Sequence, residues 1–425
     1  MTNKFSKSSD LDGRKKLVFS DYACLLSVVL LCLSICRGGH EEYAIPTIYS
    51  CYIIIALNAP NFRKLSFKPV MPALPFALVL FPLLIIQALT CESYFSISSA
   101  FWAVILFLLF AFCAMLLLCS GLEAYIWKII NAFTVAASIV IVFEYIAFMF
   151  GVRLYTLPGL GDWIFNAWEF SGVGAFRPCA FFSEASHFAE LGLFSAYYYL
   201  FIRRSFPKFL IIAVGCLAST SSLGIIGCAA LFFAYLFIVA FSKNYFKTRG
   251  FGKTALIVRL FLIIFIVIMF LLVAWYLQVA DTWLTNRLLD GGTSSTRVVR
   301  SYELFNLMDP AEQFFGIGLQ NQAIYLNANG IILPSDFNET LTNREFAASL
   351  GYVLCTCGIV GIVAFAWIFV SSCLDADKKK TVLVILTLYI LATCCVFSRA
   401  MFIFILYFCL VDINKINVWY KNVVR

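Results

Sequence analysis

The chain has 425 residues, of which 62% are apolar and only 13% are charged. A water-soluble globular protein is nearer one quarter charged and about half apolar, so this composition excludes a soluble fold and predicts that lipid surrounds most of the chain. The net charge of +8 does not indicate a nucleic-acid partner, because the basic residues lie in short loops between apolar runs. Most of the sixteen cysteines lie within apolar runs without zinc spacing, so we expect no metal.

Long apolar runs dominate the sequence from residue 19 onward. A membrane-spanning helix needs about 20 apolar residues, and the sequence predicts an all-α polytopic bundle of about twelve such helices within residues 19–412. The flanking segments 1–18 and 413–425 are expected to be cytoplasmic tails, and the first run is expected to remain uncleaved. The expected spans are 19–36, 44–57, 73–90, 97–119, 126–150, 185–202, 207–219, 222–241, 255–277, 346–372, 381–397 and 400–412.

The loop charges predict the orientation of these spans. If the N-terminus is cytoplasmic, twenty-two of the 31 basic residues face the cytoplasm, eight face outward and Arg259 lies within a span, as the positive-inside rule requires. The C-terminus is then cytoplasmic too. The two longest connections, 151–184 and 278–345, lie on the outer, periplasmic side, where we expect short helices. Loops of this length are usually functional or disordered, and apolar pairs such as Phe314-Phe315 favour a packed structure for the second.

The kind of basic residue also differs between the two sides. On this topology all sixteen lysines are cytoplasmic, whereas the outward basic residues are all arginines. The planar guanidinium group is the better bidentate ligand for phosphate, so we expect at least two of these arginines to bind phosphate. The simpler alternative is that lysine is disfavoured on the outer side. The outward arginines are Arg37, Arg153, Arg177, Arg287, Arg297, Arg300, Arg344 and Arg399.

The segment 177–190 gathers ionisable residues at the predicted start of a span. Pro178 biases Arg177 toward an extended conformation. Ser183 is the predicted N-cap of the helix, with Glu184 in its first turn and His187 on the same face. Ionisable groups at membrane depth are costly and are functional by default, although a capped helix start in interfacial water would also accommodate these charges.

Two further segments carry outward arginines. Arg297 and Arg300 are predicted to share one polar face of a helix that Pro310 ends, which is a reasonable anion site or an ordinary amphipathic surface helix. The sequence Gly316-Ile317-Gly318 downstream predicts a tight turn. Arg399 lies between the last two apolar runs, where it either reaches the outer interface or faces the bundle interior.

Four short runs, in this order, resemble the Wzy family of O-antigen and polysaccharide repeat-unit polymerases, which are relatives of the O-antigen ligases. The run RPCAFFSEASHFAELG at 177–192 is similar to the family pattern Arg-Pro…Phe-Phe-x-Glu-Pro-Ser-His-Phe-Ala, with Ala185 in place of the frequent proline. The other runs are LASTSSLGIIG at 217–227, STRVVRSYELF…FFGIGLQN at 295–321 and GIVGI at 358–362.

The resemblance implies a GT-C-like, metal-independent lipid-linked glycosyltransferase of the bacterial cell inner membrane. Its donor and acceptor would be oligosaccharides linked to undecaprenyl pyrophosphate, a chain-length regulator would be a further partner, and no cofactor is expected. The alternatives are an O-antigen ligase acting on lipid A core, a flippase or other transporter, and a membrane scaffold without enzymatic activity. For this reaction we expect Glu184 and His187 to be the catalytic residues, with either of them taking the proton of the acceptor hydroxyl or with Glu184 only orienting an arginine. The expected pyrophosphate ligands are Arg177, Arg297, Arg300 and Arg399.

Overall fold

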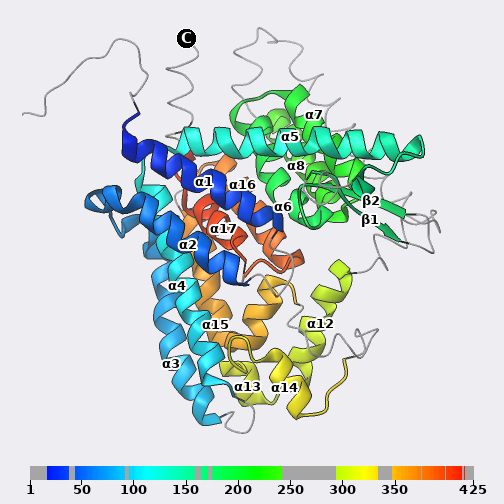
Figure 1. Ribbon diagram of the computed structural model, residues 1–425. Coiled ribbons are helices and arrows are strands. Elements are labelled where there is room, and N and C mark those ends of the chain that lie inside the picture. The colour runs from blue at the N-terminus through cyan, green and yellow to red at the C-terminus, as the bar shows by residue number, and fades with distance from the viewer. Residues whose placement is uncertain are drawn as a thin grey trace, which may run out of the picture.

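The protein is predominantly helical in the ranges that the computed structural model describes (Figure 1). These ranges are 17–37, 44–90, 95–157, 164–170, 175–241, 293–333, 347–374, 376–397, 399–413 and 416. The α-helices are α1 (Phe19–Arg37), α2 (Ala44–Asn58), α3 (Leu74–Thr90), α4 (Ile97–Cys119), α5 (Glu123–Met149), α6 (Ala185–Tyr197), α7 (Phe206–Ala218), α8 (Ser222–Phe241), α12 (Thr293–Leu307), α13 (Pro310–Phe315), α14 (Gln322–Ala328), α15 (Ser349–Leu374), α16 (Lys378–Thr393) and α17 (Met401–Leu410).

Five helical segments in the described ranges are long and apolar enough to cross a membrane. They are Lys68–Thr90, Ile97–Cys119, Glu123–Met149, Ser222–Val239 and Ser349–Leu374. Other expected spans are shorter: α7 has 13 residues and α17 has 10, and ten residues rise only about 15 Å against a hydrocarbon core of about 30 Å. The expected span 255–277 lies outside the described residues. The structure therefore supports a helical membrane protein, and the figure of twelve spans stays a prediction.

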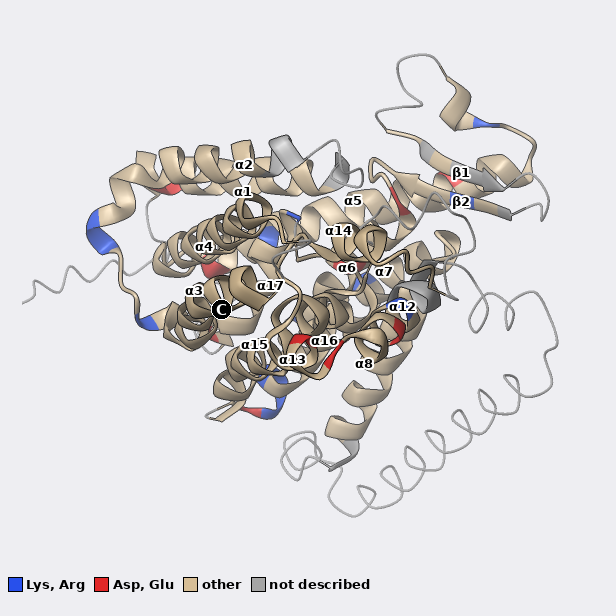
Figure 2. Ribbon diagram, turned by 90° about the horizontal axis from the view of Figure 1, so that it is seen from below, with Lys and Arg blue, Asp and Glu red and all other residues tan. Residues whose placement is uncertain are grey.

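The long helices run in two directions. In Figure 1, α3, α4 and α15 run from top to bottom and α3 packs on both of the others, whereas α5 crosses the upper part of the view and packs on α6, α7 and the hairpin. The short helices α12 and α13 lie against α15. Charged positions are few, and most helices are uncharged along most of their length (Figure 2). The described helices therefore do not form one parallel bundle.

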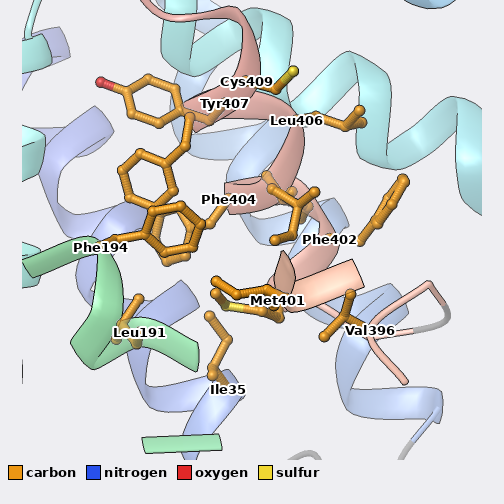
Figure 3. Packing of buried hydrophobic residues seen from close by; sticks show 14 of the residues in the cluster. Ile35, Leu191, Phe194, Val396, Met401, Phe402, Phe404, Leu406, Tyr407 and Cys409 are labelled. Atoms are coloured by element: carbon orange, nitrogen blue, oxygen red, sulfur yellow. The ribbon is translucent and has the colours of Figure 1, made fainter. Parts of the chain in front are cut away.

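The centre of the molecule is α17. Nine of its residues, from Met401 to Cys409, are buried, which is typical of a helix that is apolar on all sides. Figure 3 shows Phe402, Phe404 and Tyr407 of α17 in the same cluster as Leu191 and Phe194 of α6. Phe194 stacks on Phe408 with ring centroids 4.0 Å apart. This packing explains how so short an apolar run is accommodated: protein surrounds it.

The long helix α15 is interrupted at Gly358, which has φ 65° and ψ −168°. A continuous helix would bond the carbonyls of Cys355 and Thr356 to residues four positions later. Here they accept instead from the N–H groups of Ile317, at 3.1 Å, and Gly318, at 2.9 Å. The predicted tight turn is therefore present, and we call residues 316–318 the glycine turn. Its backbone replaces the hydrogen bonds that α15 loses.

Glycine is required on both sides of this contact. A Cβ atom at Gly316 would collide with the carbonyl of Thr356, and one at Gly358 would collide with the carbonyl of Phe314. Gln87 of α3 holds the two segments together, since its Nε2 donates to the carbonyls of Phe315 (2.6 Å) and Thr356 (2.9 Å). The glycine turn is thus inserted between α3 and the break in α15.

The two long connections that the sequence predicts on the outer side have different structures. Residues 278–345 include the short helices α12, α13 and α14, as expected. In residues 151–184 the main element is instead an antiparallel hairpin of β1 (Asn166–Phe170) and β2 (Ala175–Ala180), in which Trp168 pairs with Arg177. Pro178 explains the difference, because it disfavours helix at Arg177 and is tolerated in an edge strand.

Candidate functional site

The hairpin leads directly into α6, which carries the predicted catalytic pair. Arg177 lies on β2, so its predicted extended conformation is confirmed. The helix begins at Ala185, and Glu184 is its N-cap, with φ −140° and ψ 152°. The predicted N-cap, Ser183, was therefore wrong by one residue. The Ser183 hydroxyl is instead engaged with His187, with Oγ 2.8 Å from the imidazole Nδ1.

The imidazole of His187 has a hydroxyl on one side and a carboxylate on the other. Its Nε2 lies 4.0 Å from Glu184 Oε2, which also accepts a hydrogen bond from the Ser186 hydroxyl at 2.8 Å. The His187 side chain is 4% exposed and that of Glu184 is 35% exposed. Ser183 thus orients a buried imidazole, while Glu184 presents a carboxylate that a substrate can reach. Both groups are suited to proton transfer.

One turn beyond His187, α6 carries a second carboxylate, Glu190, whose side chain is fully buried. Its Oε1 accepts from Arg399 Nη2 at 2.7 Å, and Arg399 Nε donates to the carbonyl of Cys395. Arg399 therefore faces the interior, which decides between the two orientations considered for it. The sequence analysis did not assign a role to Glu190. The available signal was that Glu190 and Arg399 both lie in or beside apolar runs, where a charged residue needs a partner of opposite charge.

The turn that carries Arg399 is fixed by the start of α15. The Ser349 hydroxyl donates to the carbonyl of Cys394 at 2.7 Å and accepts from the N–H of Val396 at 2.8 Å. Both groups lie in the connection between α16 and α17, where a turn needs partners for its free backbone groups. The position of Arg399 thus depends on α15 as well as on α6.

Arg300 lies on α12, which packs on α15. It is 3% exposed, and its neighbour Ser301 packs so closely on Gly351 of α15 that a Cβ atom there would collide with the serine side chain. The Ser301 carbonyl also accepts from Cys355 Sγ at 3.1 Å. The backbone of Arg297 belongs to α12, but its side chain lies outside the described part of the chain.

Three ionisable groups lie near the end of β2: Arg177, Glu144 and Glu184. Glu144 of α5 is 1% exposed, and its Oε2 accepts from the N–H of Ala180 at 3.0 Å. Burial raises the pKa of the neighbouring Cys179 thiol; Arg177 opposes the rise, whereas Glu144 and Glu184 add to it. The structure thus brings Arg177 and Glu184 near a third ionisable group, Glu144, which the sequence analysis left unassigned.

The assembled site has carboxylates and an imidazole for proton transfer, and guanidinium groups for binding anions. In the described ranges, no three His, Cys, Asp or Glu side chains gather as metal ligands would. Arg177, Glu184 and His187 lie on β2 and at the start of α6, Glu190 of the same helix pairs with Arg399, and α12, which carries Arg300, packs on α15. Comparison of the sequence with family models and with curated proteins finds no match.

Proposed function

We propose that the protein is a polysaccharide polymerase that extends glycans on a lipid carrier at the periplasmic face of the inner membrane. The observation that carries the proposal is the charged network around α6. An acid–base pair at the start of α6 lies on the same helix as Glu190, which pairs with Arg399 from a separate part of an apolar protein. The order of the Wzy-like motifs supports the same reading, because Arg177, Glu184 and His187 belong to the first of them and Arg297 and Arg300 to the third. The spans, the cytoplasmic termini and the chain-length regulator expected from the sequence belong to this proposal.

In the proposed reaction, a hydroxyl of the incoming lipid-linked repeat unit attacks the anomeric carbon of the growing chain. The bond from that carbon to undecaprenyl pyrophosphate breaks, and the hydroxyl proton passes to Glu184 or His187. Arg177, Arg297 and Arg300 neutralise the charge on the leaving pyrophosphate, with Arg399 behind them. Removing one such donor typically raises the barrier by about 2.7–4 kcal/mol. Neither a metal nor a nucleotide sugar takes part.

The test is the length of the polysaccharide made in living cells. Arg177→Lys and Arg297→Lys keep the positive charge but lose the bidentate geometry, so we expect short or absent long-chain polysaccharide on a gel while protein levels stay normal. Normal ladders from both variants would contradict the pyrophosphate site.

The alternative activity closest in chemistry is ligation to lipid A core, because a ligase would use the same carrier and the same charged groups. A deletion strain separates the two activities. Loss of a polymerase leaves core capped by one repeat unit, whereas loss of a ligase leaves bare core and lipid-linked polymer that accumulates. Bare core in the deletion strain would overturn the assignment as a polymerase.

A further inference from the structure

The chain turns sharply between β2 and α6, and the turn begins at a strained residue. Ala180, the last residue of β2, has φ +50°, a left-handed conformation that costs a residue with a side chain roughly 1–2 kcal/mol. Such strain persists only where the surroundings enforce it. The N–H of Ala180 donates a hydrogen bond to the carboxylate of Glu144. This bond connects the corner to α5.

α5 supports the hairpin and the corner along one face. Phe148 stacks on Phe176 of β2, with ring centroids 4.1 Å apart. Phe133 packs edge-on against Phe181, with centroids 4.7 Å apart, just beyond the corner. Residue 144 lies about three helical turns after residue 133 and one turn before residue 148, so the three side chains share one face of α5. Glu144 is the polar contact between two aromatic ones.

A buried carboxylate is a costly way to fill this position. Glu144 is 1% exposed, and its second oxygen, Oε1, is buried with no hydrogen-bond partner among the described residues. Burying a charged or polar group without full compensation is unfavourable, and a leucine or methionine would pack there without that cost. A carboxylate at this position can accept the hydrogen bond from the N–H of Ala180, whereas an apolar side chain cannot.

We propose that Glu144 is a positioning residue that fixes the corner between β2 and α6. Holding the N–H of Ala180 sets the direction in which the chain enters α6. It thereby sets the placement of Glu184 and His187, four and seven residues later. The effect on catalysis rests on the proposed function; the effect on the corner does not.

The corner can be tested through Cys179, which lies beside Ala180 and is fully buried. A buried thiol with a raised pKa reacts slowly. Glu144→Met keeps the volume but cannot accept the hydrogen bond, and we expect maleimide to label Cys179 about tenfold faster, roughly the effect of one hydrogen bond on local opening. Glu144→Gln still offers an acceptor oxygen and should retain protection. Labelling is read peptide by peptide by mass spectrometry on the full chain in detergent.

Ser138→Ala is the matched control, because Ser138 is buried on α5 and its hydroxyl donates to the carbonyl of Thr134 in the same helix. It should leave Cys179 protected. Equal labelling of Cys179 in the wild type and in Glu144→Met would overturn the proposal. So would fast labelling in Glu144→Gln and Glu144→Met alike.

Polymer formation by purified protein then separates the two proposals. Glu144→Met should lower the rate about tenfold or more and Glu144→Gln should restore it. If Glu184→Gln and His187→Ala polymerise normally, the proposed function fails, whatever happens at the corner. If those two variants are inactive while Glu144→Met polymerises at the wild-type rate with Cys179 protected, the positioning role alone fails.

Discussion

At the scale of single residues, the Glu190–Arg399 pair shows how charge is tolerated in this apolar protein. The two groups are 2.7 Å apart, and the carboxylate is fully buried. Removing one partner of a buried pair leaves an uncompensated charge and costs about 3–5 kcal/mol, whereas replacing both with apolar residues is often neutral. The pair therefore contributes little net stability while requiring both of its members.

This asymmetry gives a prediction. Glu190→Leu and Arg399→Met should each lower the free energy of unfolding by about 3–5 kcal/mol, and the double variant should be far more stable than the sum implies. Thermal unfolding in detergent measures all three. If the double variant loses as much as the two single changes together, the residues are not paired.

Single residues also differ in how well the sequence predicts their role in the candidate site. Arg177 was correctly predicted to be extended, because Pro178 acts on its immediate neighbour. The N-cap was misplaced by one residue because both Ser183 and Glu184 are polar, and their backbone angles decide which of them caps. Glu190 was missed because its partner lies 209 residues away: a single sequence shows that both charges occur in apolar runs, but not which of its charged residues meet.

At the scale of elements, the break in α15 is the main departure from the expected pattern. Residues 346–372 read as one continuous apolar span, because an isolated glycine within a helical run is tolerated at a modest cost. The contacts that make Gly358 a break come from Phe314 and the glycine turn, about 40 residues earlier in the chain. The turn itself was predictable from local sequence; its insertion into a helix was not.

Gly358→Ala distinguishes an interrupted helix from a continuous one by the sign of its effect. In a continuous helix, alanine would stabilise by roughly 0.8–1 kcal/mol. Here it must adopt φ 65° and collide with the carbonyl of Phe314, so we expect destabilisation of more than about 2 kcal/mol. Thermal unfolding measures the change.

Gly192→Ala is the control for this experiment. A Cβ atom at that position in α6 would meet its nearest neighbours at 3.7 Å, which is ordinary contact. It should be neutral or stabilising. A stabilised Gly358→Ala protein would contradict the break.

At the scale of the whole molecule, composition predicted a helical membrane protein, which the structure supports, whereas the number of spans expected from hydropathy stays a prediction. Apolar runs such as α17 look the same whether lipid or protein surrounds them, and a run of about 10–14 residues more often marks a buried helix than a span. The buried surroundings of α17 and the direction of α5, which runs across the direction of α3 and α4, are tertiary features (Figure 1). Local sequence does not specify them.

Orientation is a prediction that belongs to this scale. Reporter fusions should place residues 177 and 297 outside the cytoplasm and residues 205 and 247 inside it, since the lysines and arginines near the latter pair obey the positive-inside rule. Alkaline phosphatase and a cytoplasmic reporter, fused at the same sites, give opposite readings. A cytoplasmic position for residue 177 would remove the basis for a periplasmic reaction.

The insertion of the glycine turn into α15 has a consequence for biogenesis. The carbonyls of Cys355 and Thr356 would cost several kcal/mol each if they were left open in hydrocarbon, so the interrupted helix α15 is a poor substrate for membrane insertion without the glycine turn. The ribosome makes the turn before it makes the helix, and the missing donors have therefore already been synthesised when the interrupted segment emerges. Consider a rearranged chain in which residues 349–374 are translated before the glycine turn. It would still encode every contact of the mature protein, but we expect it to stall in assembly and be degraded.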